Sequence, residues 1–97
     1  MKIVRVALAG TLESSDLMVK ISPLEGELQL VLHSEVMHQF GPQIEKVARD
    51  CLAGLGVTEG LVVIEDKGAL DCVVAARVRT AIARAVDHWK ADWSAFL

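Results

Sequence analysis

The spacing of apolar residues changes near Ser34 from a period of two to a helical period, and this change constrains the fold more than any other feature. Ahead of Ser34, three short runs alternate apolar residues with small or polar ones, which is typical of strands with one buried face. Pro23 ends the second run, and Glu25-Gly26 turns the chain into the third. We expect an antiparallel meander with one wet face, whose apolar positions are Val4, Val6, Leu8, Leu17, Val19, Ile21, Leu28, Leu30 and Leu32.

Beyond Ser34, the apolar residues between Val36 and Leu55 follow helical spacing. Pro42 lies inside this pattern, where its missing N–H and its ring disfavour a continuous helix. We therefore expect a short turn capped by Ser34, followed by a main helix that begins at Pro42 and ends at Gly54 and Gly56.

The remaining segment predicts one strand and one helix. Residues Gly60 to Asp66, GLVVIED, are rich in β-branched types, and an apolar stripe at helical spacing then extends from Leu70 to Trp93 with Asp66 as a candidate N-cap. The order βββαβα indicates an α+β fold, a two-layer sandwich with two helices packed on one face of a mostly antiparallel sheet of about four strands. We expect a single domain over residues 1–97.

Composition excludes several classes of function. The net charge of −3 and the pI of about 5.5 argue against nucleic-acid binding, which needs clustered Lys and Arg. The longest run without a charged residue, Val36 to Ile44, has nine residues, too few to span a membrane. The first residues predict a strand better than a secretion signal, so we expect a cytoplasmic protein. A hydrophobic fraction of 53% suggests that a partner covers part of the apolar surface.

Neither the cysteines nor the histidines form a recognisable site. Cys51 and Cys72 each lie within an apolar helical pattern, so we expect free core cysteines in a reducing compartment. His33, His38 and His88 lack a metal-ligand spacing, and we expect surface histidines and no metal on this chain.

The last helix carries charged and aromatic residues with structural interpretations. Arg77, Arg79 and Arg84 gather there, with Arg79 pointing away from the other two, which indicates a solvated face or a protein interface. Trp89 and Trp93 are most simply core residues or contacts to a partner.

Two serines lie between acidic residues in the stretch Glu13-Ser14-Ser15-Asp16, which has the residue types of a tight hairpin turn. A nucleophilic serine needs a base in hydrogen-bond reach and an oxyanion site, and the sequence offers neither. Two interpretations remain: Ser14 and Ser15 are simply turn residues, or one of them is a site of covalent attachment by another enzyme.

The stretch DKGALDC, Asp66 to Cys72, precedes the last helix. It fits an ordinary capped helix start. Alternatively, Lys67, Gly68 and the free N–H groups of the first turn provide a docking point for a phosphate or for a partner's carboxylate.

The stretches AGTLESSD and DKGALDC together resemble the acyl carrier (gamma) subunit of citrate lyase, over about Ala9 to Ala85. In that family, the first serine of the motif carries a phosphoribosyl-dephospho-CoA group through a phosphodiester. That serine is Ser14 here, and Ser15 lies between it and the aspartate.

The resemblance implies a carrier without catalytic residues or metal of its own. A holo-carrier synthase attaches the cofactor, whose thiol holds the acetyl or citryl thioester during cleavage of citrate to oxaloacetate and acetate. The citrate lyase alpha subunit, an acyl transferase, and the beta subunit, the lyase, are the implied partners. A base beside Ser14 is not needed, because the bond-making during turnover belongs to those subunits.

Two alternatives stay open. One is the acyl carrier subunit of malonate decarboxylase, which resembles this family and uses a similar serine-linked cofactor. The other is a small interaction module without a prosthetic group, in which Ser14 is only a turn residue.

Overall fold

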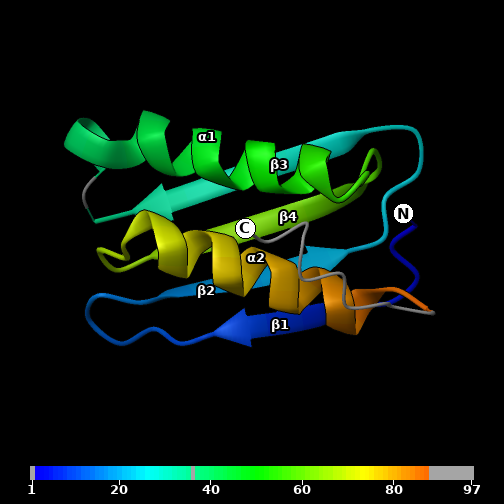
Figure 1. Cartoon of the computed structure of the whole chain (residues 1–97), viewed down its shortest axis with the longest axis horizontal. Coiled ribbons are helices and arrows are strands. Elements are labelled where there is room, and N and C mark those ends of the chain that lie inside the picture. Colours follow the sequence, from blue (N-terminus) through cyan, green and yellow to red (C-terminus); the bar gives the residue numbers. More distant parts are fainter. Residues whose placement is uncertain (1, 36, 88–97) are drawn as a thin grey trace.

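Four strands form one mixed sheet in the order β1-β2-β4-β3 (Figure 1). The computed structural model describes residues 2–35 and 37–87, which contain β1 (Ala7–Gly10), β2 (Leu17–Ser22), β3 (Leu28–Ser34), α1 (Met37–Gly54), β4 (Gly60–Asp66) and α2 (Asp71–Ala85). The pairs β1–β2 and β2–β4 are antiparallel, whereas β3 and β4 run parallel. The expected α+β sandwich, with its order βββαβα and its mostly antiparallel sheet, is confirmed.

The expected meander is wrong, because β4 lies between β2 and β3. The eighteen residues of α1 provide the long crossover that two parallel neighbours require, so β3 and β4 can lie side by side. The apolar, β-branched sequence of β4 suits an internal strand that is paired on both edges.

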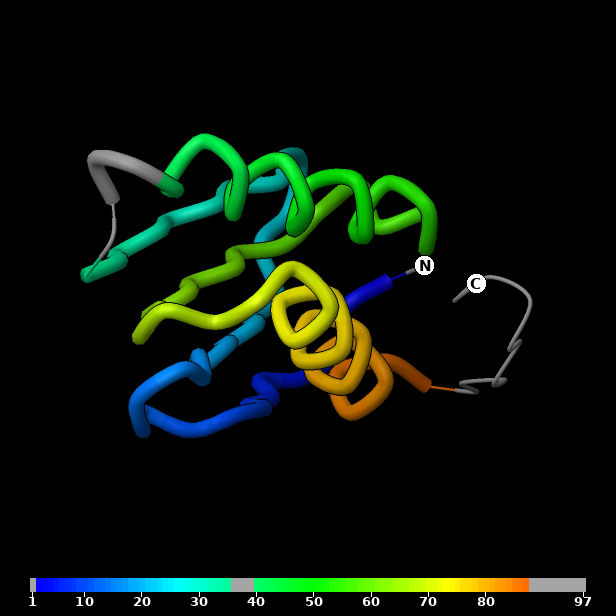
Figure 2. The backbone as a smooth tube through the Cα atoms, turned by 60° about the vertical axis from the view of Figure 1, so that its left-hand side comes forward, coloured from blue at the N-terminus to red at the C-terminus, as the bar shows by residue number. Residues whose placement is uncertain are grey.

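Both helices pack on the same face of the sheet (Figure 2). Helix α1 contacts β3, and α2 contacts β1 and β2. The core between the layers is apolar, and the alternation expected for β2 and β3 is confirmed. Its most buried side chains are Leu17, Val19, Ile21, Leu52, Val62, Ile64, Val74, Val78 and Ile82.

The expected orientation of the first strand is wrong, because the face of β1 that carries the larger apolar side chains is turned away from the core. Ala7 and Ala9 point into the core, whereas Val6 and Leu8 are 57% and 50% exposed. The strand lies under α2, which contributes Ala81 and Ala85 to the same core. Small side chains on both elements let the helix backbone lie close to the strand. The volume of the side chains, and not their hydrophobicity, therefore determines which face of β1 is turned to the core.

Helix α1 is continuous through Pro42, so the predicted break is wrong. The proline removes one helical hydrogen bond near the start of the helix, and the preceding Gly41 has no Cβ to clash with the proline ring. Ser34 is the last residue of β3, and its hydroxyl donates to the carboxylate of Asp66.

The core assignment of the cysteines is wrong for Cys72, which is exposed in the first turn of α2. Cys51 is half-buried, and burial raises the pKa of its thiol.

The predictions for four residues cannot be compared with the structure: His88, Trp89, Trp93 and the side chain of His38 lie outside the described residues. Neither helix in the described ranges has the length and hydrophobicity needed to cross a membrane.

Gly10 allows β1 to turn into the loop that carries the two serines. Its φ is +98°, and a Cβ on this residue would lie 1.9 Å from the carbonyl oxygen of Leu17. Glycine is therefore required both by the backbone conformation and by the close approach of the next strand.

We expect Gly10→Ala to lower the free energy of unfolding by more than the roughly 1–3 kcal/mol that a strained positive φ costs alone. Gly26→Ala is the matched control, because Gly26 also has a positive φ (+85°) but has no atom within 4 Å of its added Cβ. Urea unfolding of the two variants measures the difference, and equal losses would contradict the clash at Gly10.

Candidate functional site

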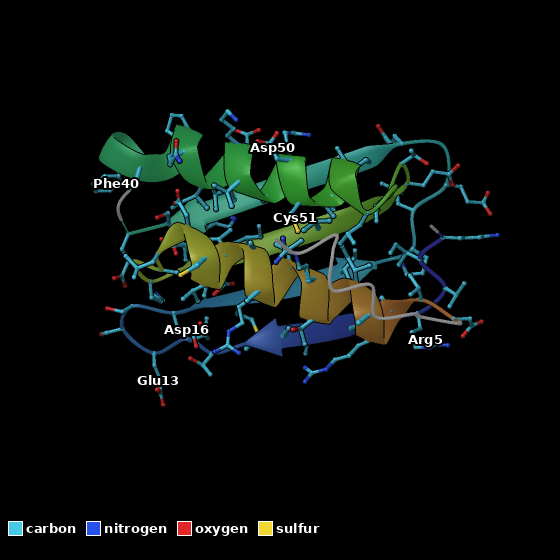
Figure 3. All side chains as sticks on the ribbon, viewed as in Figure 1. Arg5, Glu13, Asp16, Phe40, Asp50 and Cys51 are labelled. Atoms are coloured by element: carbon cyan, nitrogen blue, oxygen red, sulfur yellow. The ribbon has the colours of Figure 1, made fainter. Side chains whose placement is uncertain are left out.

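Ser14 lies at the tip of the loop that joins β1 to β2, residues 11–16, which we call the serine loop. The N–H of Asp16 donates to the carbonyl of Glu13 (3.2 Å), so the four residues Glu13 to Asp16 form the turn that the sequence predicts. Ser15 takes a positive φ of 65°, and both serines are exposed. Figure 3 shows the Glu13 side chain pointing away from the molecule.

Asp16 fixes the base of the serine loop. Its carboxylate accepts hydrogen bonds from Nε (3.1 Å) and Nη2 (2.9 Å) of Arg77, from Thr11 Oγ1 (2.7 Å) and from the N–H of Leu17 (2.7 Å). The Arg77 guanidinium, followed by the Thr11 and Leu17 hydrogen bonds, lowers the pKa of Asp16 to about 2. Arg77 belongs to α2, so this contact ties the loop to a core helix.

The two sequence motifs meet at this point. The N–H of Ser15 donates to the carbonyl of Lys67 (2.8 Å), and the N–H of Lys67 donates to the carbonyl of Asp16 (2.9 Å). These bonds continue the β2–β4 ladder, whose last pair is Leu17 with Asp66. AGTLESSD and DKGALDC therefore form one structural unit, with the serine loop resting on the segment that connects β4 to α2.

Asp66 organises that connecting segment. Its buried carboxylate, 1% exposed, accepts hydrogen bonds from Ser34 Oγ (2.8 Å) and from the N–H groups of Gly68 (3.0 Å) and Ala69 (2.9 Å). It does not cap α2, as the sequence predicted, because the helix begins only at Asp71 and Leu70 holds the N-cap position. The carboxylate caps the turn after its own strand.

This arrangement argues against a phosphate site built on Lys67 and Gly68. The N–H groups of Gly68 and Ala69 already donate to a carboxylate, and Lys67 Nζ pairs with Glu35 Oε1 at 3.1 Å. Lys67 and Gly68, which suggested anion binding together with the first turn of the helix, thus have partners within the chain.

The role of Arg77 escaped the sequence analysis. A solvated face or a protein interface was expected, but Arg77 pairs with Asp16, and Arg84 Nη1 donates to the carbonyl of Leu8 at 2.8 Å. Sixty-one residues separate Arg77 from Asp16, and no local pattern links them. The hints in the sequence were the acidic residues that flank the serines and the three arginines on a helix with an apolar stripe.

The serine loop and the segment that connects β4 to α2 together present the exposed hydroxyl of Ser14 on a hydrogen-bonded turn. In the described ranges, Ser14 has no hydrogen bond to a histidine or lysine side chain, and no group of three His, Cys, Asp or Glu residues is placed to hold a metal ion. A hydroxyl exposed on a fixed turn is accessible to a modifying enzyme. It lacks the neighbouring base that would make it a nucleophile by itself.

Comparison with known proteins gives the class. An acyl carrier family model, described as Malonate decarboxylase delta subunit (MdcD), matches residues 4–85. One chain of a crystal structure of a Pseudomonas malonate decarboxylase hetero-tetramer in complex with malonate has the same fold. It superposes with a TM-score of 0.71 at 22% identity, over 89% of this chain and 93% of that one. The solved structure shows the fold, and the family model shows that the chain belongs to an acyl carrier protein family.

Closer relatives narrow the class. Citrate lyase acyl carrier proteins are 81% identical in Rhodopseudomonas palustris (strain BisA53), over 98% of both chains, and 60% identical in Enterobacter sp. (strain 638), over 97% of both. In Haemophilus influenzae (strain PittEE), the identity is 53% over the full length of both chains. The chain belongs to the citrate lyase acyl carrier protein family.

Asp16 should make the stability of the protein depend on pH. The pKa of this group is lower in the folded protein than its ordinary value of 3.8, so its contribution is complete above about pH 4 and is lost as the pH falls towards about 2. We expect Asp16→Asn to unfold at lower urea concentration than the wild type at pH 6, and this difference to shrink steadily towards pH 2.

Glu13→Gln is the control, because it removes a carboxylate from the same loop without touching Arg77. A difference between wild type and Asp16→Asn that stays constant from pH 6 to pH 2 would contradict the ion pair.

Proposed function

We propose that Ser14 carries a phosphoribosyl-dephospho-CoA group through a phosphodiester, and that residues 1–97 work as one carrier domain of citrate lyase. The observation that supports this most is the exposure of Ser14 on a turn whose base is held by Arg77 and by the backbone of Lys67. Such a site gives a modifying enzyme access to the hydroxyl without local unfolding.

Attachment of the group requires only an accessible hydroxyl from this chain. A holo-carrier synthase would supply the base and a phosphoryl donor with a phosphate or pyrophosphate leaving group. The Ser14 Oγ would lose its proton to that base and form the bond to phosphorus while the P–O bond to the leaving group breaks. The chain contributes the hydroxyl and its fixed position, since the serine loop is closed by the Asp16–Arg77 pair. The Ser15 side chain has the same chemistry, but the Ser15 N–H is committed to Lys67, which holds that residue against the connecting segment.

The proposed carrier has no catalytic residue of its own. Once bound, the group supplies a thiol that holds the acetyl or citryl thioester. The alpha subunit would exchange acetyl for citrate, and the beta subunit would cleave the citryl unit. The tether keeps the thioester near both active sites at an effective concentration of roughly millimolar. Magnesium, where the complex uses it, would belong to the cleaving subunit.

The charge around Ser14 favours an extended position for the attached phosphoribosyl-dephospho-CoA group, which we call the arm. In this position the arm stays away from the serine loop. Arg77 compensates the charge of Asp16, so Glu13, which points outward, is the acidic side chain left to repel the phosphates of the group (Figure 3).

Two alternatives are less well supported. The malonate decarboxylase carrier shares the fold at 22% identity, whereas relatives named citrate lyase acyl carrier protein reach 81%. An interaction module without a prosthetic group leaves the held, exposed serine unexplained. We also propose a cytoplasmic location, with which the two free cysteines are compatible.

The attachment site is tested by intact mass and peptide mapping of protein made in a citrate-fermenting host. We expect Ser14→Ala to abolish the mass added by the group. Ser15→Gly is the matched variant, because glycine tolerates the positive φ of Ser15, and it should keep the full addition. Loss of the group from Ser15→Gly but not from Ser14→Ala would move the site by one residue, and an unmodified wild type would favour the interaction module.

A further inference from the structure

A groove of about 540 Å³ opens between the start of α1 and the start of α2. Among the side chains that line it are Phe40, Gln43 and Ile44 from α1 and Leu70, Asp71 and Cys72 from the other wall. Phe40 and Leu70 are 52% and 70% exposed, although both are large and apolar. Figure 3 places Phe40 at the end of the molecule where the serine loop also lies.

The groove begins close to Ser14. Gly68 lines it, and one hydrogen bond of 2.8 Å and five covalent bonds connect the Cα atom of Ser14, through Ser15 and Lys67, to the Cα atom of Gly68. The two Cα atoms are therefore no more than about 10 Å apart. A group attached to Ser14 starts within reach of the groove.

The chemistry of the lining selects an uncharged occupant. Among the described residues that line the groove there is no lysine, arginine or histidine, and the carboxylate of Asp71 accepts a hydrogen bond from Gln43 Nε2 at 2.9 Å. In this described lining, phosphates and carboxylates would meet Asp71 without a compensating cation. A thiol or an acetyl thioester has no charge, and its apolar atoms would cover Phe40 and Leu70.

The size of the groove fits a small group better than a protein surface. Small-molecule sites measure about 300–1,000 Å³ and are mostly apolar with a few polar groups. A stable protein interface instead buries about 800 Å² on each partner and needs a broad face. A tethered end at roughly millimolar effective concentration needs only a dissociation constant of that order to stay bound.

We propose that this groove holds the uncharged thioester end of the arm on Ser14 while no partner subunit is engaged. The inference rests on the proposed function, and it adds a resting position for the acetyl group in which the groove walls shield the thioester from water. An arm end with free carboxylates, as in the citryl form, is not held there.

Cys72 reports the occupancy of the groove, because its thiol is exposed and lines it. The full chain is prepared without the group and with the acetyl-loaded group, intact mass verifies the loading, and the rate of alkylation by iodoacetamide is followed on the Cys72 peptide. We expect at least about a twofold slower reaction in the acetyl-loaded chain, since half occupancy is reached when the dissociation constant equals the effective concentration. Cys51, which does not line this groove, is the internal reference.

Two variants separate occupancy from indirect effects. Leu70→Gln removes an apolar wall of the groove and should abolish the protection, whereas Leu8→Gln changes a similarly exposed leucine on β1 and should retain it. Each variant is compared with its own unloaded form.

Equal Cys72 rates in verified loaded and unloaded chains would overturn the proposal while leaving attachment at Ser14 intact. Protection that appears only when the alpha or beta subunit is added would assign the groove to a partner. Equal loss of protection in Leu8→Gln and Leu70→Gln would also contradict the resting position.

Discussion

The guanidinium of Arg77 reaches from α2 to both carboxylate oxygens of Asp16, and the position of Ser14 depends on this contact. An exposed ion pair alone contributes little to stability. This carboxylate also accepts from Thr11 and Leu17, so the loop, the strand after it and the helix converge on one group. The consequence is geometric: the turn with Ser14 keeps its conformation although its tip is in solvent.

The sheet topology brings the remaining parts of the site to the same end of the molecule (Figure 1). Because β4 lies beside β2, the end of β4 is adjacent to the start of β2, and Lys67 can bond to the serine loop. Because β3 runs parallel to β4, both strands end at this end of the sheet, and α1, which follows β3, begins there as well. An attachment point and an apolar groove are thus held about 10 Å apart or less by elements distant in sequence.

Features that depend on local periodicity could be predicted from the sequence. Features that depend on contacts between residues distant in sequence could not. The alternation of β2 and β3, the element order and the turn at Ser14 are local, and each is confirmed. The place of β4 in the sheet, the partner of Arg77 and the burial of Ala9 in place of Leu8 depend on contacts between distant segments. Pro42 was misread because Gly41 relieves the clash that usually ends a helix. The choice of Ser14 over Ser15 came from the motif and stays a proposal.

Amide hydrogen exchange measured by NMR tests most directly whether an exposed serine is held on a fixed base. The N–H groups of Ser15 and Lys67 donate to backbone carbonyls, whereas the described residues offer no acceptor to the N–H of Ser14. The account predicts that the Ser15 and Lys67 amides exchange at least about tenfold more slowly than the Ser14 amide, and that Arg77→Met removes this protection. Exchange at Ser15 as fast as at Ser14 in the wild type would contradict it.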